Sequence, residues 1–107
     1  MVFAYATDDG SLTAFSTEGE AIAYAEGIDV EDGAWRFFAD DGAELTPCFK
    51  AANERSAWFV RSGNYNLVRG ERSNFNLRDL MPEVRSYEGI VRSLAEVLRV
   101  LNGNRIE

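Results

Sequence analysis

The sequence predicts an α+β fold, in which an antiparallel sheet of five to six strands is built from hairpins. A short helix from the N-terminal half and a C-terminal amphipathic helix are expected to pack on this sheet. Three observations lead to the prediction: runs of β-forming residues flank turn dipeptides, a capping motif follows the first pair of runs, and apolar residues recur at helical spacing after residue 86. The length of 107 residues and the 46% hydrophobic content indicate a single domain, 1–107.

Two hairpins are predicted in the first fifty residues. Each contains an Asp-Asp-Gly turn, a frequent signal of a β-turn between apolar runs. The paired runs and their turns are residues 2–6 and 11–15 around Asp8-Asp9-Gly10, and residues 34–39 and 43–49 around Asp40-Asp41-Gly42. Pro47 has no backbone N–H, so we expect it at a sheet edge or a bulge.

The segment between these hairpins is predicted to be helical. Thr17 stands three residues before Glu20, which is the spacing of a capping box, and this opens a helix over residues 18–26. Gly27, followed by Ile28, is expected to end the helix. Residues 29–33 then form a polar turn.

A third hairpin is predicted to join residues 57–61 to residues 65–69 through Ser62-Gly63-Asn64. After a polar stretch, a short helical turn is expected over residues 76–81, before Pro82.

The last helix is expected over residues 87–101, capped by Ser86 and ended by Gly103. Apolar residues recur there at i, i+3, i+4 and i+7, which predicts a face packed on the sheet. These residues are Tyr87, Ile90, Val91, Leu94, Val97, Leu98 and Leu101.

Charge is divided unevenly between the halves of the chain. The first fifty residues carry eleven carboxylates against Arg36 and Lys50, a net charge of −9, whereas residues 51–107 come to +2. A surface with this much negative charge attracts cationic partners and repels nucleic acid and anionic lipid. The alternative is a solvated acidic surface with no binding role, which only keeps a small protein soluble.

The composition excludes several kinds of chemistry. Without histidine there is no Ser-His or Cys-His nucleophile pair and no histidine-containing metal site. Cys48, the only cysteine, lies in an apolar run and is expected to be buried and inert. No signal peptide and no run of about eighteen apolar residues is found, so we expect a cytoplasmic protein.

Neither a metal site nor a nucleic-acid site is predicted. The run from Asp29 to Gly33 has closely spaced oxygen ligands, but its glycine falls at the fifth position rather than the sixth that an EF-hand needs. The arginines of the second half interleave with aromatic residues, yet the net charge of −7 opposes association with phosphates. We expect no catalytic residue, metal or cofactor.

The whole chain resembles the small immunity proteins of bacterial polymorphic toxin systems, particularly those of contact-dependent growth inhibition. The likeness rests on the length, the lack of a signal, the hairpins closed by a C-terminal amphipathic helix, and the acidic segment Glu26-Gly27-Ile28-Asp29-Val30-Glu31-Asp32-Gly33-Ala34-Trp35. These families share a role more than a residue signature. The resemblance implies a cytoplasmic protein that binds a delivered toxin domain, often a nuclease with a basic cleft.

The leading hypothesis is therefore a non-enzymatic inhibitor that binds a cognate toxin domain as a 1:1 heterodimer through acidic turns. The expected partner-binding residues are Asp8, Asp9, Asp29, Glu31, Asp32, Trp35, Asp40, Asp41 and Glu44. One alternative is a small-molecule-binding or catalytic domain with a pocket lined by Trp35, Trp58 and Tyr65. Another is a DNA-mimicking regulator.

Overall fold

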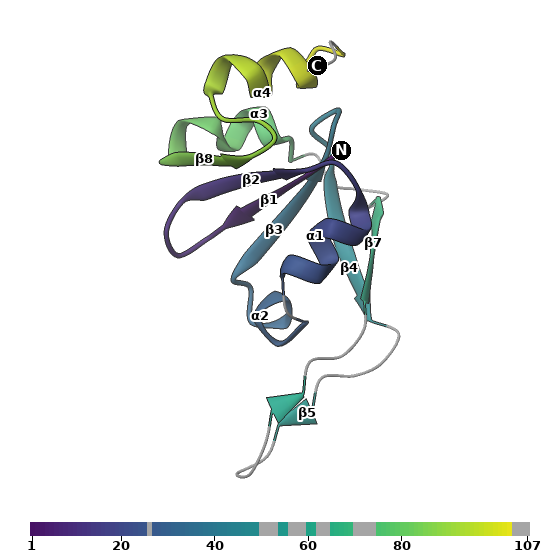
Figure 1. Ribbon diagram of the computed structural model, residues 1–107. Coiled ribbons are helices and arrows are strands. Elements are labelled where there is room, and N and C mark those ends of the chain that lie inside the picture. Colours follow the sequence, from purple (N-terminus) through teal and green to yellow (C-terminus); the bar gives the residue numbers. More distant parts are fainter. Residues whose placement is uncertain (26, 50–53, 56–59, 62–64, 70–74, 104–107) are drawn as a thin grey trace.

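The protein is built on a six-stranded mixed sheet, seen in Figure 1. The computed structural model describes residues 1–25, 27–49, 54–55, 60–61, 65–69 and 75–103. In order across the sheet, the strands are β7 (Tyr65–Arg69), β4 (Glu44–Phe49), β3 (Trp35–Ala39), β1 (Val2–Ala6), β2 (Ser11–Phe15) and β8 (Ser86–Gly89). Neighbouring strands are antiparallel except β2 and β8, which are parallel. The predicted α+β class, with helices packed on a sheet of five to six strands, is confirmed. The sheet is mostly antiparallel as expected, and the pairing of β8 with β2 is the departure.

Helices cover both faces of the sheet. One face carries α1 (Glu18–Tyr24) and α2 (Gly27–Glu31), and the other carries α3 (Leu77–Leu80), the 3₁₀ helix η1 (Met81–Glu83) and α4 (Leu94–Leu101). Side chains alternate along a strand, so adjacent residues enter different layers. Phe37 packs in the cluster with Ala21 of α1, and Phe38 packs in the cluster with Leu80 of α3.

The first hairpin has the predicted bounds, and Thr17 caps α1 as expected by accepting a hydrogen bond from the Glu20 amide at 3.2 Å. The predicted end of α1 is wrong. Ala25 already has extended dihedral angles, and Gly27 begins α2 instead of ending α1. Val30 is buried against the sheet, so apolar contact makes part of the expected polar turn helical. Glu26 lies outside the described residues.

The predicted last helix is two elements. Residues 86–89 form β8, Gly89 ends that strand with a φ of +88°, and α4 begins only at Leu94. Ser93, not Ser86, is the N-cap, because its hydroxyl accepts the Glu96 amide at 3.1 Å. Of the predicted core residues, three are instead exposed: Ile90, Leu94 and Leu98. The shorter helix turns only part of its apolar surface to the sheet, through Val97, Val100 and Leu101.

The third predicted hairpin is not formed as expected. Strand β7 pairs with β4, and β6 (Val60–Arg61) pairs with β5 (Glu54–Arg55). Pairing with β4 buries Tyr65 and Leu67 beneath α1, which explains the choice of partner. Residues 57–59 and the turn 62–64 of the predicted hairpin lie outside the described residues. The short helix before Pro82 is confirmed as α3, capped by Asn76.

Pro47 lies within β4, between β3 and β7. The Ala39 amide donates to the Ala43 carbonyl. In an antiparallel pair every second residue forms hydrogen bonds with the same neighbouring strand, so Leu45 and then Pro47 are the next positions that bond toward β3. The register with β3 stops at Leu45, because proline has no N–H to extend it. On its other side, Pro47 faces Leu67 of β7. This is a non-hydrogen-bonded pair, so the Leu67 amide points to the free edge of the sheet, where it donates to the Glu18 carboxylate of α1 at 2.7 Å and α1 covers that edge.

Candidate functional site

The strand register places the acidic turns at two opposite ends of the sheet. Val2 pairs with Ala39 and Ala6 pairs with Trp35, so the turn after β1 lies at the same end as the start of β3. The turn after β3 lies at the opposite end, beyond a strand length of roughly 13 Å. The nine expected binding residues therefore do not form one surface. Asp8, Asp9, Asp29 and Trp35 come together, and Asp40, Asp41 and Glu44 lie elsewhere.

The first group lines a groove of about 430 Å³ on the α1–α2 face of the sheet. We call it the acidic groove, and its lining consists of Ala6, Asp8, Asp9, Ser11, Tyr24, Asp29, Ala34, Trp35 and Glu88. Ala6 and Ser11 are small buried residues of adjacent strands, and they leave a recess where larger side chains would fill the space. Four carboxylates and no basic side chain occur among these lining residues.

Tyr24 and Trp35 form the aromatic wall of the acidic groove. Their ring centroids are 5.5 Å apart in an edge-on arrangement, and the Phe15 ring packs against Tyr24 in a tilted arrangement at 5.3 Å. Tyr24 is 55% exposed, although it is the last residue of α1. The helix end is fixed from below, because the buried Tyr65 hydroxyl donates to the Ala25 carbonyl at 2.6 Å. An exposed ring on a fixed helix end can accept a partner's side chain with little loss of entropy.

The carboxylates of the acidic groove differ in their local bonding. Asp9 accepts hydrogen bonds from the Ser11 side chain and amide, and these lower its pKa below the ordinary value of 3.8. Glu88 accepts a long hydrogen bond of 3.5 Å from the Thr13 hydroxyl. The side chains of Asp8 and Asp29 have no hydrogen-bonding or ionic partner within the described part of the chain. Glu31 and Asp32 are exposed nearby but do not line the groove.

At the opposite end of the sheet, arginines neutralise two of the expected carboxylates. Glu44 receives two hydrogen bonds from Arg36, at 2.8 and 3.0 Å, and this pairing raises the pKa of Arg36. Asp41 accepts the Ala43 amide at 3.0 Å and is bridged by Arg69 at 2.7 Å, and both interactions lower its pKa. Only Asp40 remains exposed and unpaired in this group, among the residues described. This end is therefore a weaker site for a cation than the acidic groove.

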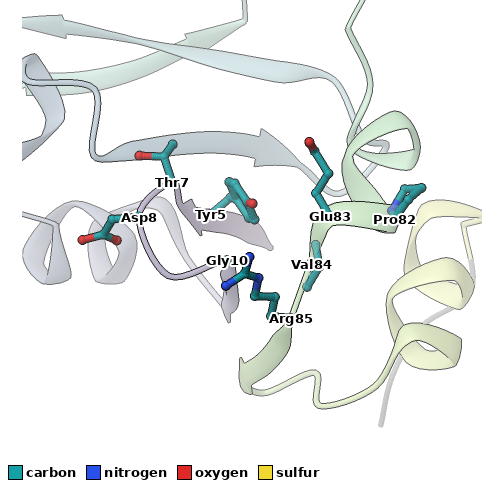
Figure 2. A pocket seen from close by; sticks show the side chains of 8 residues that line it. All are labelled: Tyr5, Thr7, Asp8, Gly10, Pro82, Glu83, Val84 and Arg85. Atoms are coloured by element: carbon teal, nitrogen blue, oxygen red, sulfur yellow. The ribbon is translucent and has the colours of Figure 1, made fainter.

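A second depression, of about 350 Å³, opens on the other side of the turn after β1, and Figure 2 shows its lining. We call it the Arg85 pocket, and it is lined by Tyr5, Thr7, Asp8, Gly10, Pro82, Glu83, Val84 and Arg85. Asp8 borders both depressions, so the turn separates them. In contrast to the acidic groove, this pocket has charges of both signs.

Five lining residues of the acidic groove are not among the expected binding residues, and three of these have polar or aromatic side chains: Tyr24, Ser11 and Glu88. Glu88 arrives through the parallel pairing of β8 with β2, where Thr13 faces it. No local pattern signals that pairing. Tyr24 lies within the expected helix 18–26, and its position off the apolar stripe of that helix is the sequence signal that its ring could face a partner.

Of the three residues expected to line the alternative pocket, the structure describes Trp35 and Tyr65. Tyr65 is buried in the layer beneath α1, so it does not line the acidic groove beside Trp35. Trp58 lies outside the described residues. Cys48, expected to be buried, is exposed on β4, because alternation turns its side chain away from the packed layer.

Comparisons with protein families, curated proteins and solved structures find no match to this chain. Within the described residues, no group of three or more acidic or cysteine side chains is arranged to hold a metal ion. None of the helices described here has the length and apolar character that crossing a membrane requires.

Proposed function

We propose that this chain is a non-enzymatic immunity protein, which binds a basic toxin domain in the cytoplasm and neutralises it as a 1:1 complex. The observation that carries the proposal is the acidic groove, where four carboxylates surround an exposed tyrosine and a tryptophan. Inhibition then requires only that the groove and its rim cover the toxin's substrate-binding surface.

The groove suits a lysine or arginine side chain of the partner. The charged end can pair with Asp8 or Asp29, and the aliphatic stem can lie on the Tyr24 ring. A guanidinium over such a ring gains about 0.5–2 kcal/mol beyond its ion pairs. The volume of about 430 Å³ is large enough for more than one such side chain.

Long-range attraction supports the same assignment. The net charge of −7 raises the encounter rate with a basic protein, and the effect weakens as salt screens it. Because arginines neutralise Asp41 and Glu44, the groove residues Asp8 and Asp29 contribute most of the directed attraction. The groove therefore sets the orientation in which the partner arrives.

The test compares charge reversals of equal size at the two ends of the sheet. The probe is a basic toxin domain, taken from the C-terminus of a large secreted protein where a gene for one adjoins the gene of this chain. The readouts are growth protection and association kinetics at several salt concentrations. We expect Asp8→Lys and Asp29→Lys to slow association about tenfold at low salt and to flatten its salt dependence. Asp40→Lys is the matched control, because it makes the same charge change about a strand length away.

Each result bears on a separate part of the proposal. If the wild-type chain neither binds the domain nor protects cells, the immunity function is wrong. If the chain binds but the groove variants behave like Asp40→Lys, the groove is not the docking site. Normal unfolding curves for all variants are required, and we expect them because these side chains are exposed.

A further inference from the structure

The Arg85 pocket contains a buried tyrosine whose hydroxyl lacks a partner. Tyr5 is 8% exposed, and its ring packs in the core with Leu12 and Phe38. Its hydroxyl makes no hydrogen bond with the residues that the structure describes. No fully enclosed polar side-chain atom in those residues is unsatisfied, so the small exposed part of Tyr5 includes the hydroxyl that opens into the pocket.

Arg85 supplies a positive charge to the same pocket. Its amide donates to the Gly10 carbonyl at 2.8 Å, and its aliphatic stem lies over Gly10. A side chain at position 10 would meet the Arg85 Cγ at 3.0 Å, so the absence of a Cβ allows the stem to lie there. The guanidinium has no carboxylate partner within the described residues. The stem is thus held in place while its charged end remains available.

The acidic residues of the pocket do not cancel this charge. Figure 2 shows the Asp8 carboxylate directed away from the Arg85 guanidinium and the Glu83 carboxylate at the opposite margin. The pKa of Arg36 is raised chiefly by its hydrogen bond with Glu44, and Glu83 and Tyr5 add smaller electrostatic contributions in the same direction. The pocket therefore offers two hydrogen-bond donors at its centre and negative charge at its rim.

We propose that the Arg85 pocket binds a carboxylate, with the Arg85 guanidinium and the Tyr5 hydroxyl as its donors. A carboxylate accepts two parallel hydrogen bonds from an arginine and has lone pairs left for a hydroxyl. The acidic rim favours a carboxylate that is flanked by basic groups. This is the pattern of an aspartate or glutamate on the basic surface of a toxin domain, and that assignment rests on the proposed function.

Such a contact would give selectivity that the acidic groove lacks. A groove of carboxylates attracts any basic protein, whereas the pocket requires a negative group at one position beside the groove. A partner without that group would leave the Arg85 and Tyr5 donors partly dehydrated and without an acceptor. The affinity of such a partner is therefore lower.

The first experiment uses acetate as the probe and acetamide as its neutral control, with amide chemical shifts of the chain as the readout. We expect acetate to shift the Gly10 and Arg85 signals in a saturable manner, and acetamide not to do so. Arg85→Gln should weaken acetate binding about tenfold, the loss expected for a charge-assisted pair. Arg99→Gln removes the same charge from the exposed side of α4 and should leave it unchanged. Absence of saturable, Arg85-dependent shifts would overturn the site.

The second experiment asks where the carboxylate comes from. Affinity for the toxin domain should fall about tenfold in Arg85→Gln and less in Tyr5→Phe, and should be unchanged in Arg99→Gln. If acetate binds but these variants hold the domain as the wild type does, the source is a free carboxylate and the partner assignment is wrong. If the wild type does not bind the domain, the proposed function fails, and the acetate titration still decides the pocket. Tyr5→Phe should unfold as the wild type does, because it removes a hydroxyl without a partner.

Discussion

Removal of one hydroxyl, by Tyr65→Phe, should destabilise the protein although it leaves the aromatic packing in place. The rings of Phe37 and Phe49 lie 6.2 and 5.4 Å from that of Tyr65, and phenylalanine keeps both contacts. The change deletes the 2.6 Å hydrogen bond to Ala25 at the end of α1. A net hydrogen bond is worth about 1 kcal/mol, and a carbonyl left without its partner costs about 1–3 kcal/mol, so we expect a loss of about 2 kcal/mol.

The measurement is chemical and thermal unfolding followed by circular dichroism. A loss of about 2 kcal/mol corresponds to a fall in Tm of roughly 10 °C for a domain of this size. Tyr24→Phe is the matched control, because it removes the same hydroxyl from a ring that is 55% exposed. If the two variants unfold together within about 0.3 kcal/mol, the Tyr65 hydroxyl does not hold the helix end.

The same tyrosine gives a prediction at high pH. Burial raises the pKa of Tyr65 to about 12, so the folded protein favours the neutral phenol. Its contribution to stability is complete below the unfolded pKa of about 10 and is lost as pH rises toward the folded value. The wild type should lose stability across this interval more steeply than Tyr65→Phe does. Equal slopes in the two proteins would contradict the burial of this hydroxyl.

Three further predictions follow from the described packing. Leu80→Ala should lower the free energy of unfolding by about 2–5 kcal/mol, because Leu80 is 2% exposed. Leu94→Ala should lower it by less than about 1 kcal/mol, because Leu94 is 46% exposed. Denaturant unfolding of the two variants checks this difference. Gly89→Ala should destabilise the protein more than Gly103→Ala does. Both glycines have positive φ, but of the two only a Cβ at position 89 meets the backbone of β2. Equal Tm values for the two variants would refute this clash. Cys48 should react with a thiol reagent in the native protein as fast as in the unfolded one, and protection until unfolding would contradict its exposure.

Local turn chemistry made much of the fold predictable. The Asp-Gly turns and the Thr17 cap act within a few residues, so the sequence defined the first two hairpins and the start of α1 correctly. The structure of residues 86–101 could not be predicted from such local signals. Its apolar spacing fits one helix as well as a strand followed by a helix, and the decisive features are Gly89 and the contact with β2.

The candidate site was predictable only in its residue types. Acidic turns and an aromatic residue were expected, but the division of the carboxylates between two ends follows from the antiparallel pairing of β1 with β3. That pairing joins residues between 29 (Ala6 with Trp35) and 37 (Val2 with Ala39) positions apart and has no local signal. The neutralisation of Asp41 and Glu44 likewise depends on which arginines the sheet brings beside them.

The parallel strand also has a consequence for how the protein is made. Thr13 and Glu88 meet across 75 positions of sequence, so closing that loop is costly and belongs to a late stage of folding. While the chain is being synthesised, β2 has no neighbour on that side until residues 86–89 have left the ribosome. One wall of the acidic groove, Glu88, and the anchor of Arg85 are added only when this strand pairs with β2. A nascent chain is therefore unable to engage a partner through either depression before residues 86–89 have been made.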